Sequence, residues 1–202
     1  MLKTKIAVLV SGGGTNLQAL IDAQNNNIIT SGEICLVISS STTAYALTRA
    51  KNAGIKTCVV SRKEHMGLDF EQKIIECLES NGIELIVLAG FMYILSSDFI
   101  AKYRDKIINV HPSLIPSFCG DGFYGLHVHE AALSYGVKVT GATVHFVNEI
   151  TDGGKIIYQK AVNIEEGDTP EILQKRVMEQ AEWIILPQAV QLVSENLAKE
   201  KN

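Results

Sequence analysis

Short runs of apolar residues alternate with amphipathic stretches along the first half of the chain. The runs are bounded by glycine and polar turn residues, which is typical of buried strands. The stretches between them place apolar residues three and four positions apart, which predicts helices with one buried face. Strands are expected at 6–10, 34–39, 57–60, 85–89 and 107–110, and helices at 17–24, 45–53 and 70–78. This alternation predicts a parallel, Rossmann-like sheet flanked by helices.

The pattern changes after Leu126. Residues 127–135 are helix-like, and two segments of alternating polarity, 138–147 and 155–162, then flank the turn-rich stretch 148–154. Two such segments around a turn predict antiparallel strands that extend the sheet.

The last part of the chain predicts one long closing helix. Thr169 is a good cap and Pro170 suits the first turn, and apolar residues recur from there as far as Leu197. Pro187 is expected to kink this helix. The predicted fold class is therefore α/β: a mostly parallel sheet flanked by helices, with antiparallel C-terminal strands and a long C-terminal helix. All 202 residues are expected to form a single domain.

Composition narrows the class of protein. The formal net charge is −4, and lysines and arginines form no cluster with aromatic residues, so nucleic acid is not an expected partner. No apolar run reaches membrane-spanning length and no signal pattern follows Met1, so we expect a cytoplasmic protein without membrane contact. The four cysteines are scattered and lack paired spacing, which predicts buried or loop thiols and no metal site.

The most informative stretch runs from Asn109 to Pro116. Asn109 and His111 are one residue apart, so in an extended strand their side chains point to the same face. Pro112 ends the strand, which places the pair at the edge of a cleft. Two polar donors there suit a developing oxyanion, whereas the pair alone is equally compatible with a polar cap at a strand end.

A glycine-rich turn, 11–18, directly follows the first strand. Its three successive glycines turn backbone N–H groups inward ahead of a helix, which favours a phosphate site over an ordinary connection. The stretch is neither a Walker loop nor a complete dinucleotide fingerprint.

Two further segments could contribute to a site, depending on what the fold places beside them. Residues 90–95 follow the fourth strand with apolar and aromatic side chains, which fit either a flat ligand ring or the core. Asp152 lies in a turn sequence, and it would favour a charged His111 if the sheet brought the two together. His127 and His129 are expected to be partly solvated, and one among these two and His145 is expected to touch a ligand.

Taken together, segments 11–18, 88–95, 109–116 and 145–154 closely resemble the phosphoribosylglycinamide formyltransferases, a folate-dependent formyltransferase family. The resemblance spans nearly the whole chain. It implies transfer of a formyl group from 10-formyltetrahydrofolate to the amine of N1-(5-phosphoribosyl)glycinamide in de novo purine (IMP) biosynthesis. It also implies a phosphate-binding half, 1–110, a folate-binding and catalytic half, 111–202, and no metal.

The resemblance assigns roles to residues of this chain. Catalysis falls to Asn109, His111 and Asp152; phosphate binding to Gly14, Thr15 and Asn16; folate binding to Met92, Tyr93, Ile94, Leu95 and Asn109; and ribose contacts to Glu179 and Glu182. The implied partners are the two small substrates, and the implied assembly is a monomer or homodimer. Tyr93 stands where many relatives have an arginine. Separately, the family's basic folate contact has no unique counterpart within 61–67, and Arg62 and Lys63 are the candidates for it.

Other functions share parts of this pattern. Methionyl-tRNA formyltransferase and formyltetrahydrofolate hydrolase have the same core motifs, but each is expected to carry a further domain for which 202 residues leave no room. The length argues against both of these families. The alternatives to the transferase are a 10-formyltetrahydrofolate hydrolase and a non-catalytic nucleotide- or folate-binding protein.

Overall fold

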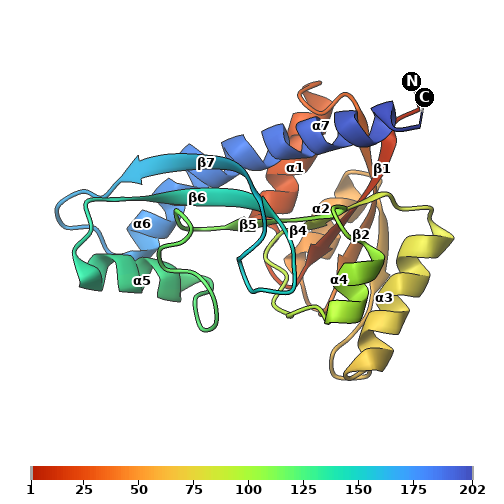
Figure 1. Cartoon of the computed structure of the whole chain (residues 1–202), viewed down its shortest axis with the longest axis horizontal. Coiled ribbons are helices and arrows are strands. Elements are labelled where there is room, and N and C mark those ends of the chain that lie inside the picture. Colours follow the sequence, from red (N-terminus) through yellow and green to blue (C-terminus); the bar gives the residue numbers. More distant parts are fainter. Residues whose placement is uncertain (1, 202) are drawn as a thin grey trace.

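The computed structural model describes residues 2–201 and contains one seven-stranded sheet of order β3-β2-β1-β4-β5-β6-β7 (Figure 1). The strands are β1 (Thr4–Val10), β2 (Gly32–Ser39), β3 (Lys56–Val59), β4 (Leu85–Leu88), β5 (Ile107–His111), β6 (Val139–Phe146) and β7 (Ile156–Asn163). The helices are α1 (Thr15–Asn25), α2 (Tyr45–Asn52), α3 (Leu68–Ser80), α4 (Ser97–Lys102), α5 (Leu126–Tyr135), α6 (Pro170–Val177), the π-helical η1 (Met178–Glu182) and α7 (Trp183–Lys199).

The strand order confirms the predicted fold class. Strands β1 to β5 pair in parallel, and β6 and β7 continue the sheet in antiparallel pairing. From β1 the chain builds outward to β2 and β3, and it then returns to the other side of β1 with β4 and β5. Ligands of open α/β sheets bind at the carboxyl ends of the strands where this reversal occurs. The sheet therefore directs attention to the ends of β1, β4 and β5.

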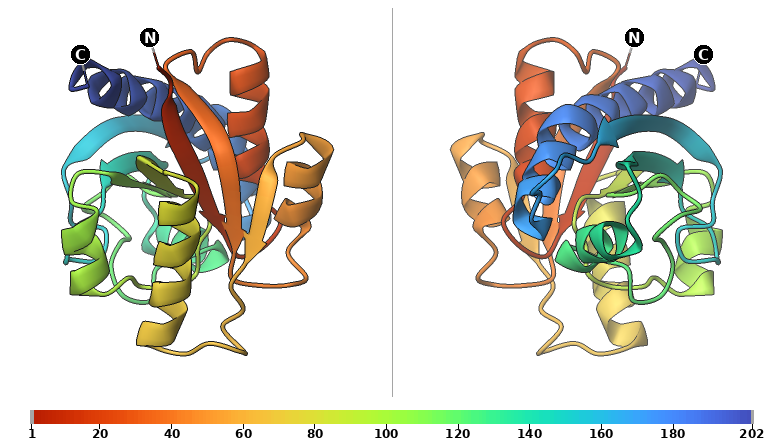
Figure 2. Two further views of the ribbon diagram at one scale, coloured as in Figure 1. Left: turned by 90° about the vertical axis from the view of Figure 1, so that its right-hand side faces the viewer. Right: turned by 90° about the vertical axis from the view of Figure 1, so that its left-hand side faces the viewer.

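Alternate residues of the central strands pack into two separate cores. Ile6, Val8 and Val10 of β1 belong to the core under α1, α2 and α7, and Ala7 and Leu9 belong to the core under α3 and α4. Strand side chains point alternately to opposite faces, so a strand buried on both faces is apolar throughout. Figure 2 shows α3 and α7 on opposite sides of the sheet.

The closing helix differs from the prediction. Helix α6 passes into the five-residue η1, and α7 then runs through Pro187 as one α-helix, so the interruption lies ahead of the proline. Over only five residues, the spacing of apolar residues cannot distinguish an α-helix from a π-helix, so the sequence pattern predicted one continuous helix. The short helix α4, which Ser96 caps by accepting from the Phe99 N–H, was not predicted.

The cysteine prediction was partly wrong. Cys58 in β3 and Cys77 in α3 form a disulfide, whereas Cys35 and Cys119 are free thiols. The paired cysteines are separated by 19 positions and come together only because α3 packs beside β3, which no local spacing reveals. No helix within residues 2–201 has the length and apolar character needed to cross a bilayer.

Candidate active site

A cavity of about 750 Å³ opens at the carboxyl ends of β4 and β5, where the sheet order reverses. Its walls come from distant parts of the chain and include Asn16, Met92, Asn109, His111, Asp152 and Glu182. The cavity therefore joins most of the segments that the sequence singled out.

Asn109 and His111 lie on one face of β5, as predicted. Ile108, which precedes the pair, and Val110, which lies between its two members, point to the opposite face, into the core under α7. The strand ends at His111, and both side chains line the cavity. The alternation of the strand thus delivers two polar groups to one wall.

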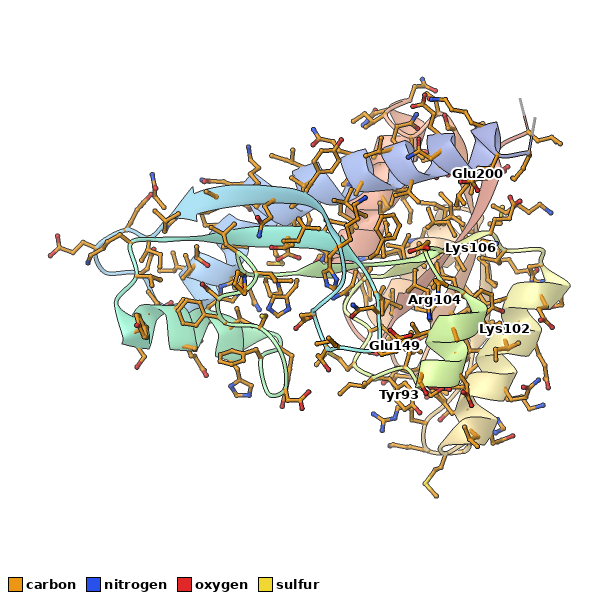
Figure 3. All side chains as sticks on the ribbon, viewed as in Figure 1. Tyr93, Lys102, Arg104, Lys106, Glu149 and Glu200 are labelled. Atoms are coloured by element: carbon orange, nitrogen blue, oxygen red, sulfur yellow. A yellow bond between two sulfur atoms is a disulfide. The ribbon has the colours of Figure 1, made fainter. Side chains whose placement is uncertain are left out.

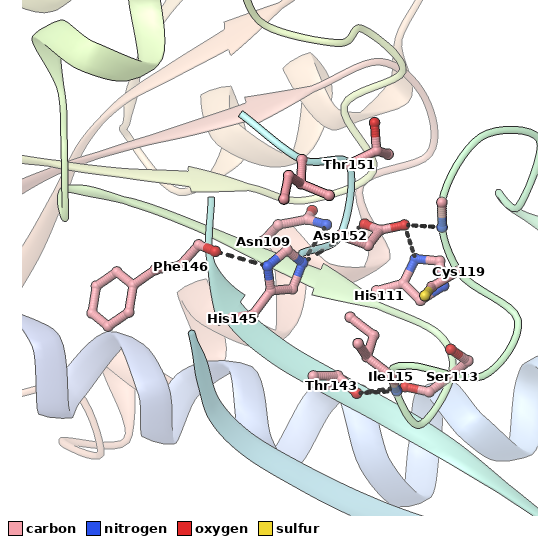
Figure 4. Close-up of polar contacts among 12 residues, drawn as sticks. Asn109, His111, Ser113, Ile115, Cys119, Thr143, His145, Phe146, Thr151 and Asp152 are labelled. Carbon is pink, nitrogen blue, oxygen red and sulfur yellow. Dashed lines mark hydrogen bonds and ion pairs between the residues drawn. The ribbon is translucent and has the colours of Figure 1, made fainter. Parts of the chain in front are cut away.

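Asp152 lies beside His111, so the expected contact is present (Figure 4). The distance from Asp152 Oδ2 to His111 Nδ1 is 3.4 Å, and the Gly120 N–H donates to the same carboxylate oxygen at 2.9 Å. His111 Nε2 lies 2.9 Å from the Phe118 carbonyl oxygen. Both ring nitrogens of His111 thus face acceptors, and only a ring protonated on both nitrogens can donate to both.

His145 orients Asn109. Its Nδ1 donates to the Phe146 carbonyl at 2.8 Å, which leaves Nε2 to accept from Asn109 Nδ2 at 3.3 Å (Figure 4). Burial lowers the pKa of His145, although the Phe146 carbonyl and Asp152 act in the opposite direction, so a neutral ring fits this arrangement. No sequence motif assigned this role. The sequence predicted that 138–147 extends the sheet but not which strand it joins; its pairing with β5 places Asn109 opposite His145.

The glycine turn leads into α1 beside the cavity. Gly14 has φ +72°, and a Cβ there would lie 2.6 Å from the Ala46 Cβ, so only glycine fits. No side chain among residues 2–201 caps α1, which leaves its first N–H groups suited to an anion. Asn16 lines the cavity, whereas Gly14 and Thr15 lie just outside its wall. Arg49 Nε donates to the Gly13 carbonyl at 2.9 Å, a neighbouring cation that the sequence analysis missed.

The buried carboxylate of Glu182 is hydrogen-bonded to Asn16, and both residues line the cavity. Asn16 Nδ2 donates to Glu182 Oε2 at 2.6 Å, and burial raises the pKa of Glu182 to about 6 despite this hydrogen bond. Glu179, the other residue of the expected ribose pair, is exposed and lies 3.8 Å from Lys175 Nζ, away from the cavity lining. Only one carboxylate of the pair is thus placed to meet a ligand in the cavity.

The four residues Met92 to Leu95 form an apolar wall of the cavity. Tyr93 packs against Phe70 with ring centroids 4.8 Å apart, and the guanidinium of Arg62 lies 5.0 Å from the centroid of the Tyr93 ring. Arg62 also donates to the Met92 carbonyl at 3.3 Å, so it is fixed at this wall.

An ion pair tethers the far side of the cavity. Arg104 Nη2 and Glu149 Oε1 are 3.0 Å apart, which ties the loop before Asp152 to the end of α4 (Figure 3). Glu149 itself lines the cavity.

The two histidines at the start of α5 have different surroundings. His127 is exposed, as expected, and pairs with Glu130 at 2.9 Å, but His129 is completely buried and the expectation of partial solvation was wrong. Two positions along a helix correspond to about 200° of rotation, which places the residues on opposite faces. Burial, and then the nearby His111, lower the pKa of His129 to about 4.

We expect His129 to make the fold sensitive to mild acid. Its pKa of about 4 in the fold lies below the ordinary value of 6.5, so below pH 6.5 the unfolded chain takes up a proton that the folded chain refuses. Between pH 7.5 and 5.0 the wild type should lose about 2 kcal/mol more unfolding free energy than His129→Gln. Urea unfolding at both pH values measures the difference. His127→Gln is the control, and equal losses in the wild type and His129→Gln would contradict the prediction.

Comparisons with known proteins agree with this geometry. Residues 4–190 match the formyl transferase family model. The chain is 41% identical over 199 residues to phosphoribosylglycinamide formyltransferase of Haemophilus influenzae, covering 98% of this chain and 91% of that protein. It is 46% identical over 193 residues to the trifunctional purine biosynthetic protein adenosine-3 of Gallus gallus, covering 95% of this chain but only 18% of that much longer protein.

The fold is similar to a solved structure as well. The glycinamide ribonucleotide transformylase 1 of Symbiobacterium toebii superposes with a TM-score of 0.89 at 38% identity, covering 96% of this chain and 89% of that one. The family match extends over nearly the whole chain and includes β1, β5, the turn with Asp152 and η1. The chain therefore belongs to the formyl transferase family.

Proposed function

We propose that this protein transfers a formyl group from 10-formyltetrahydrofolate to the amine of N1-(5-phosphoribosyl)glycinamide, a step of de novo purine biosynthesis. The observation that carries the proposal is the convergence of Asn109, His111 and Asp152 at one cavity wall. The names of the similar proteins support the choice of substrates. We further propose a cytoplasmic enzyme that acts on these small molecules as a monomer or homodimer.

The proposed chemistry begins with attack of the neutral glycinamide amine on the formyl carbon. The formyl oxygen gains negative charge as the new C–N bond forms. Asn109 Nδ2–H and the Nε2–H of protonated His111 are the donors that stabilise this charge. In the free protein Nε2 lies 2.9 Å from the Phe118 carbonyl, so binding of the formyl group exchanges that acceptor for the formyl oxygen. Asp152 opposes the positive charge of His111 at 3.4 Å and keeps the ring oriented.

Transfer is completed when the bond from the formyl carbon to the folate nitrogen breaks. The attacking amine gives up one proton and the departing folate nitrogen takes up one, so the overall step needs no other reactant. His111, backed by Asp152, is the group placed to pass this proton. The trio supplies both charge stabilisation and proton transfer, and the proposal requires no metal.

The proposed substrate sites lie on either side of the trio. Gly14, Thr15 and Asn16 bind the phosphate at the start of α1, and Glu182 accepts hydrogen bonds from the ribose hydroxyls. Met92 to Leu95, together with Asn109, contact the folate, whose flat apolar ring system suits a wall of this character. Under this proposal the folate contacts Met92 to Leu95 fall in 1–110 and the ribose contact Glu182 falls in 111–202, so the two substrate sites do not separate between the two halves of the chain.

Glu182→Gln should stabilise the free protein and weaken substrate binding. The pKa of Glu182 is about 6 in the fold against an ordinary 4.5, so above pH 6 folding carries the cost of a buried charge, about 2 kcal/mol, which glutamine removes. Loss of a charged acceptor should raise KM for the ribonucleotide about ten- to a hundredfold. Urea unfolding at pH 7.5 and steady-state kinetics measure the two effects. Glu179→Gln is the control, and an unchanged ribonucleotide KM in Glu182→Gln would exclude the ribose contact.

Arg62→Ala should raise KM for a folate donor with a glutamate tail about threefold to tenfold, because an exposed charge pair contributes little beyond 1 kcal/mol. The guanidinium is fixed at the folate wall over Tyr93, whereas the exposed Lys63 is bonded within residues 2–201 only through its backbone N–H, to Ser61 Oγ. Kinetics with donors that have and lack the tail measure the effect. Lys63→Ala is the matched control, and equal behaviour of the two variants would argue against Arg62 as the contact.

The proposed function is tested by mixing the purified protein with the ribonucleotide and a 10-formylfolate donor and following the deformylated folate by absorbance. Turnover that requires the ribonucleotide is the expected result. Loss of formyl without the ribonucleotide would instead identify a hydrolase. Binding of both ligands with no turnover would identify a non-catalytic binding protein.

A further inference from the structure

Each polar residue of β5 at the cavity has a polar residue directly opposite it in β6. Asn109 pairs in register with His145, and His111 pairs with Thr143. Thr143 in turn pairs with Gln159 of β7. Directly opposite residues of antiparallel strands point to the same face, so His111, Thr143 and Gln159 form one row across three strands.

The Thr143 hydroxyl uses its full hydrogen-bonding capacity on the segment that follows His111. It donates to the Ser113 carbonyl at 2.6 Å and accepts from the Ile115 N–H at 3.1 Å (Figure 4). Its second acceptor site takes the Gln159 amide at 3.0 Å. A hydroxyl has one donor and two acceptor sites, so none is left over. Thr143 is completely buried, so each of these bonds is shielded from water.

Gln159 reaches the same segment from the edge of the sheet. Its Nε2 donates to the Ile115 carbonyl at 2.9 Å as well as to the Thr143 hydroxyl. Gln159 therefore binds the carbonyl of Ile115 while Thr143 binds its N–H, and the two side chains together hold this residue in place. Gln159 is exposed on an edge strand, and it does not line the cavity. Its contacts therefore serve the segment and not a ligand.

The clamped segment leads back to His111. Ser113 donates through its hydroxyl to the Ser117 carbonyl at 2.5 Å, and the next residue, Phe118, presents the carbonyl that lies 2.9 Å from His111 Nε2. The ring of His111 is therefore held by Asp152 at one nitrogen and, at the other, by a loop that Thr143 and Gln159 fix.

We propose that Gln159 and Thr143 are positioning residues for formyl transfer, which set the orientation of the His111 ring through the segment from Ser113 to Phe118. The inference rests on the proposed role of His111. Misplacement of a reacting group by about 1 Å can cost a hundredfold in rate, so a clamp outside the cavity is able to control turnover.

Kinetics of paired variants test this. Gln159→Met and Thr143→Val keep the shape of each side chain and remove its polar atoms. We expect kcat to fall roughly ten- to a hundredfold, with KM for both substrates within about twofold of the wild type. Thr143→Ser retains the hydroxyl and should recover most of the activity. Lys160→Met, at the exposed neighbouring position of the same strand, should behave as the wild type.

The imidazole nitrogen resonances of ¹⁵N-histidine-labelled protein provide a readout that does not depend on turnover. Those of His111 should shift in Gln159→Met, and those of the exposed His127 should not. Values of kcat within about twofold of the wild type, a matching defect in Thr143→Ser or Lys160→Met, or unchanged His111 resonances would each overturn the inference. If the wild type itself fails to transfer formyl, the proposed function fails, and the resonances still decide whether Thr143 and Gln159 orient His111.

Discussion

Replacing Asn109 or His111 by alanine should lower kcat about a hundred- to a thousandfold, the usual cost of one oxyanion donor. Both side chains line the cavity from the end of β5, and each is already oriented, Asn109 by His145 and His111 by Asp152. Because these donors act on charge that develops during the reaction, KM should change far less than kcat. The formyl transfer assay measures both constants.

Two further variants separate donor chemistry from simple loss of volume. Asn109→Asp preserves the shape of the side chain and replaces its N–H donors by a carboxylate oxygen, so it should be at least as inactive as Asn109→Ala. His127→Ala removes an exposed histidine outside the cavity lining and should retain full activity. More than roughly a tenth of normal turnover in Asn109→Ala or His111→Ala would contradict the donor role, provided that thermal unfolding shows a folded variant.

Much of the fold could be predicted because burial determines it. The central strands β1 and β4 are almost entirely apolar and buried on both faces, whereas polar and apolar residues alternate along 138–147 and 155–162, so the change from parallel to antiparallel pairing is visible in the chain. The η1 segment was invisible, since five residues of π-helix leave the apolar spacing almost unchanged. The disulfide between Cys58 and Cys77 depends on how α3 packs, which is a tertiary property.

The site divides in the same way. The common direction of Asn109 and His111 follows from strand geometry alone. The contact of Asp152 with His111 does not, because Asp152 lies in an irregular turn, with a left-handed backbone of φ +55°, after a pair of strands whose register shifts between Val144 and His145. The burial of His129 depends on which face of α5 meets the core, and the meeting of Glu182 with Asn16 depends on the π-helical segment. Local patterns thus supplied the donors, and tertiary packing supplied their partners.

Asp152→Asn should lower kcat by roughly a hundredfold or more, since neutralising the acid that orients a catalytic histidine has costs of this order or larger. Asp152 acts on both histidines of the site, with Oδ2 3.4 Å from His111 Nδ1 and Oδ1 3.7 Å from His145 Nε2. Asparagine keeps the shape but removes the charge that opposes a protonated His111. Steady-state kinetics of Asp152→Asn and Asp152→Ala measure the effect, with Asp98→Asn, an exposed acid of α4 outside the cavity lining, as control.

The comparison between Asn and Ala at position 152 decides which property of the carboxylate matters. An asparagine oxygen can still accept the Gly120 N–H that Asp152 accepts at 2.9 Å, so Asp152→Asn keeps the loop attached whereas Asp152→Ala releases it. If charge is the essential property, both variants lose kcat to a similar extent and only Asp152→Ala gains a higher KM. Near-normal turnover in Asp152→Asn alone would show that the residue serves to anchor the loop, and the proposed proton transfer through His111 would then need no carboxylate.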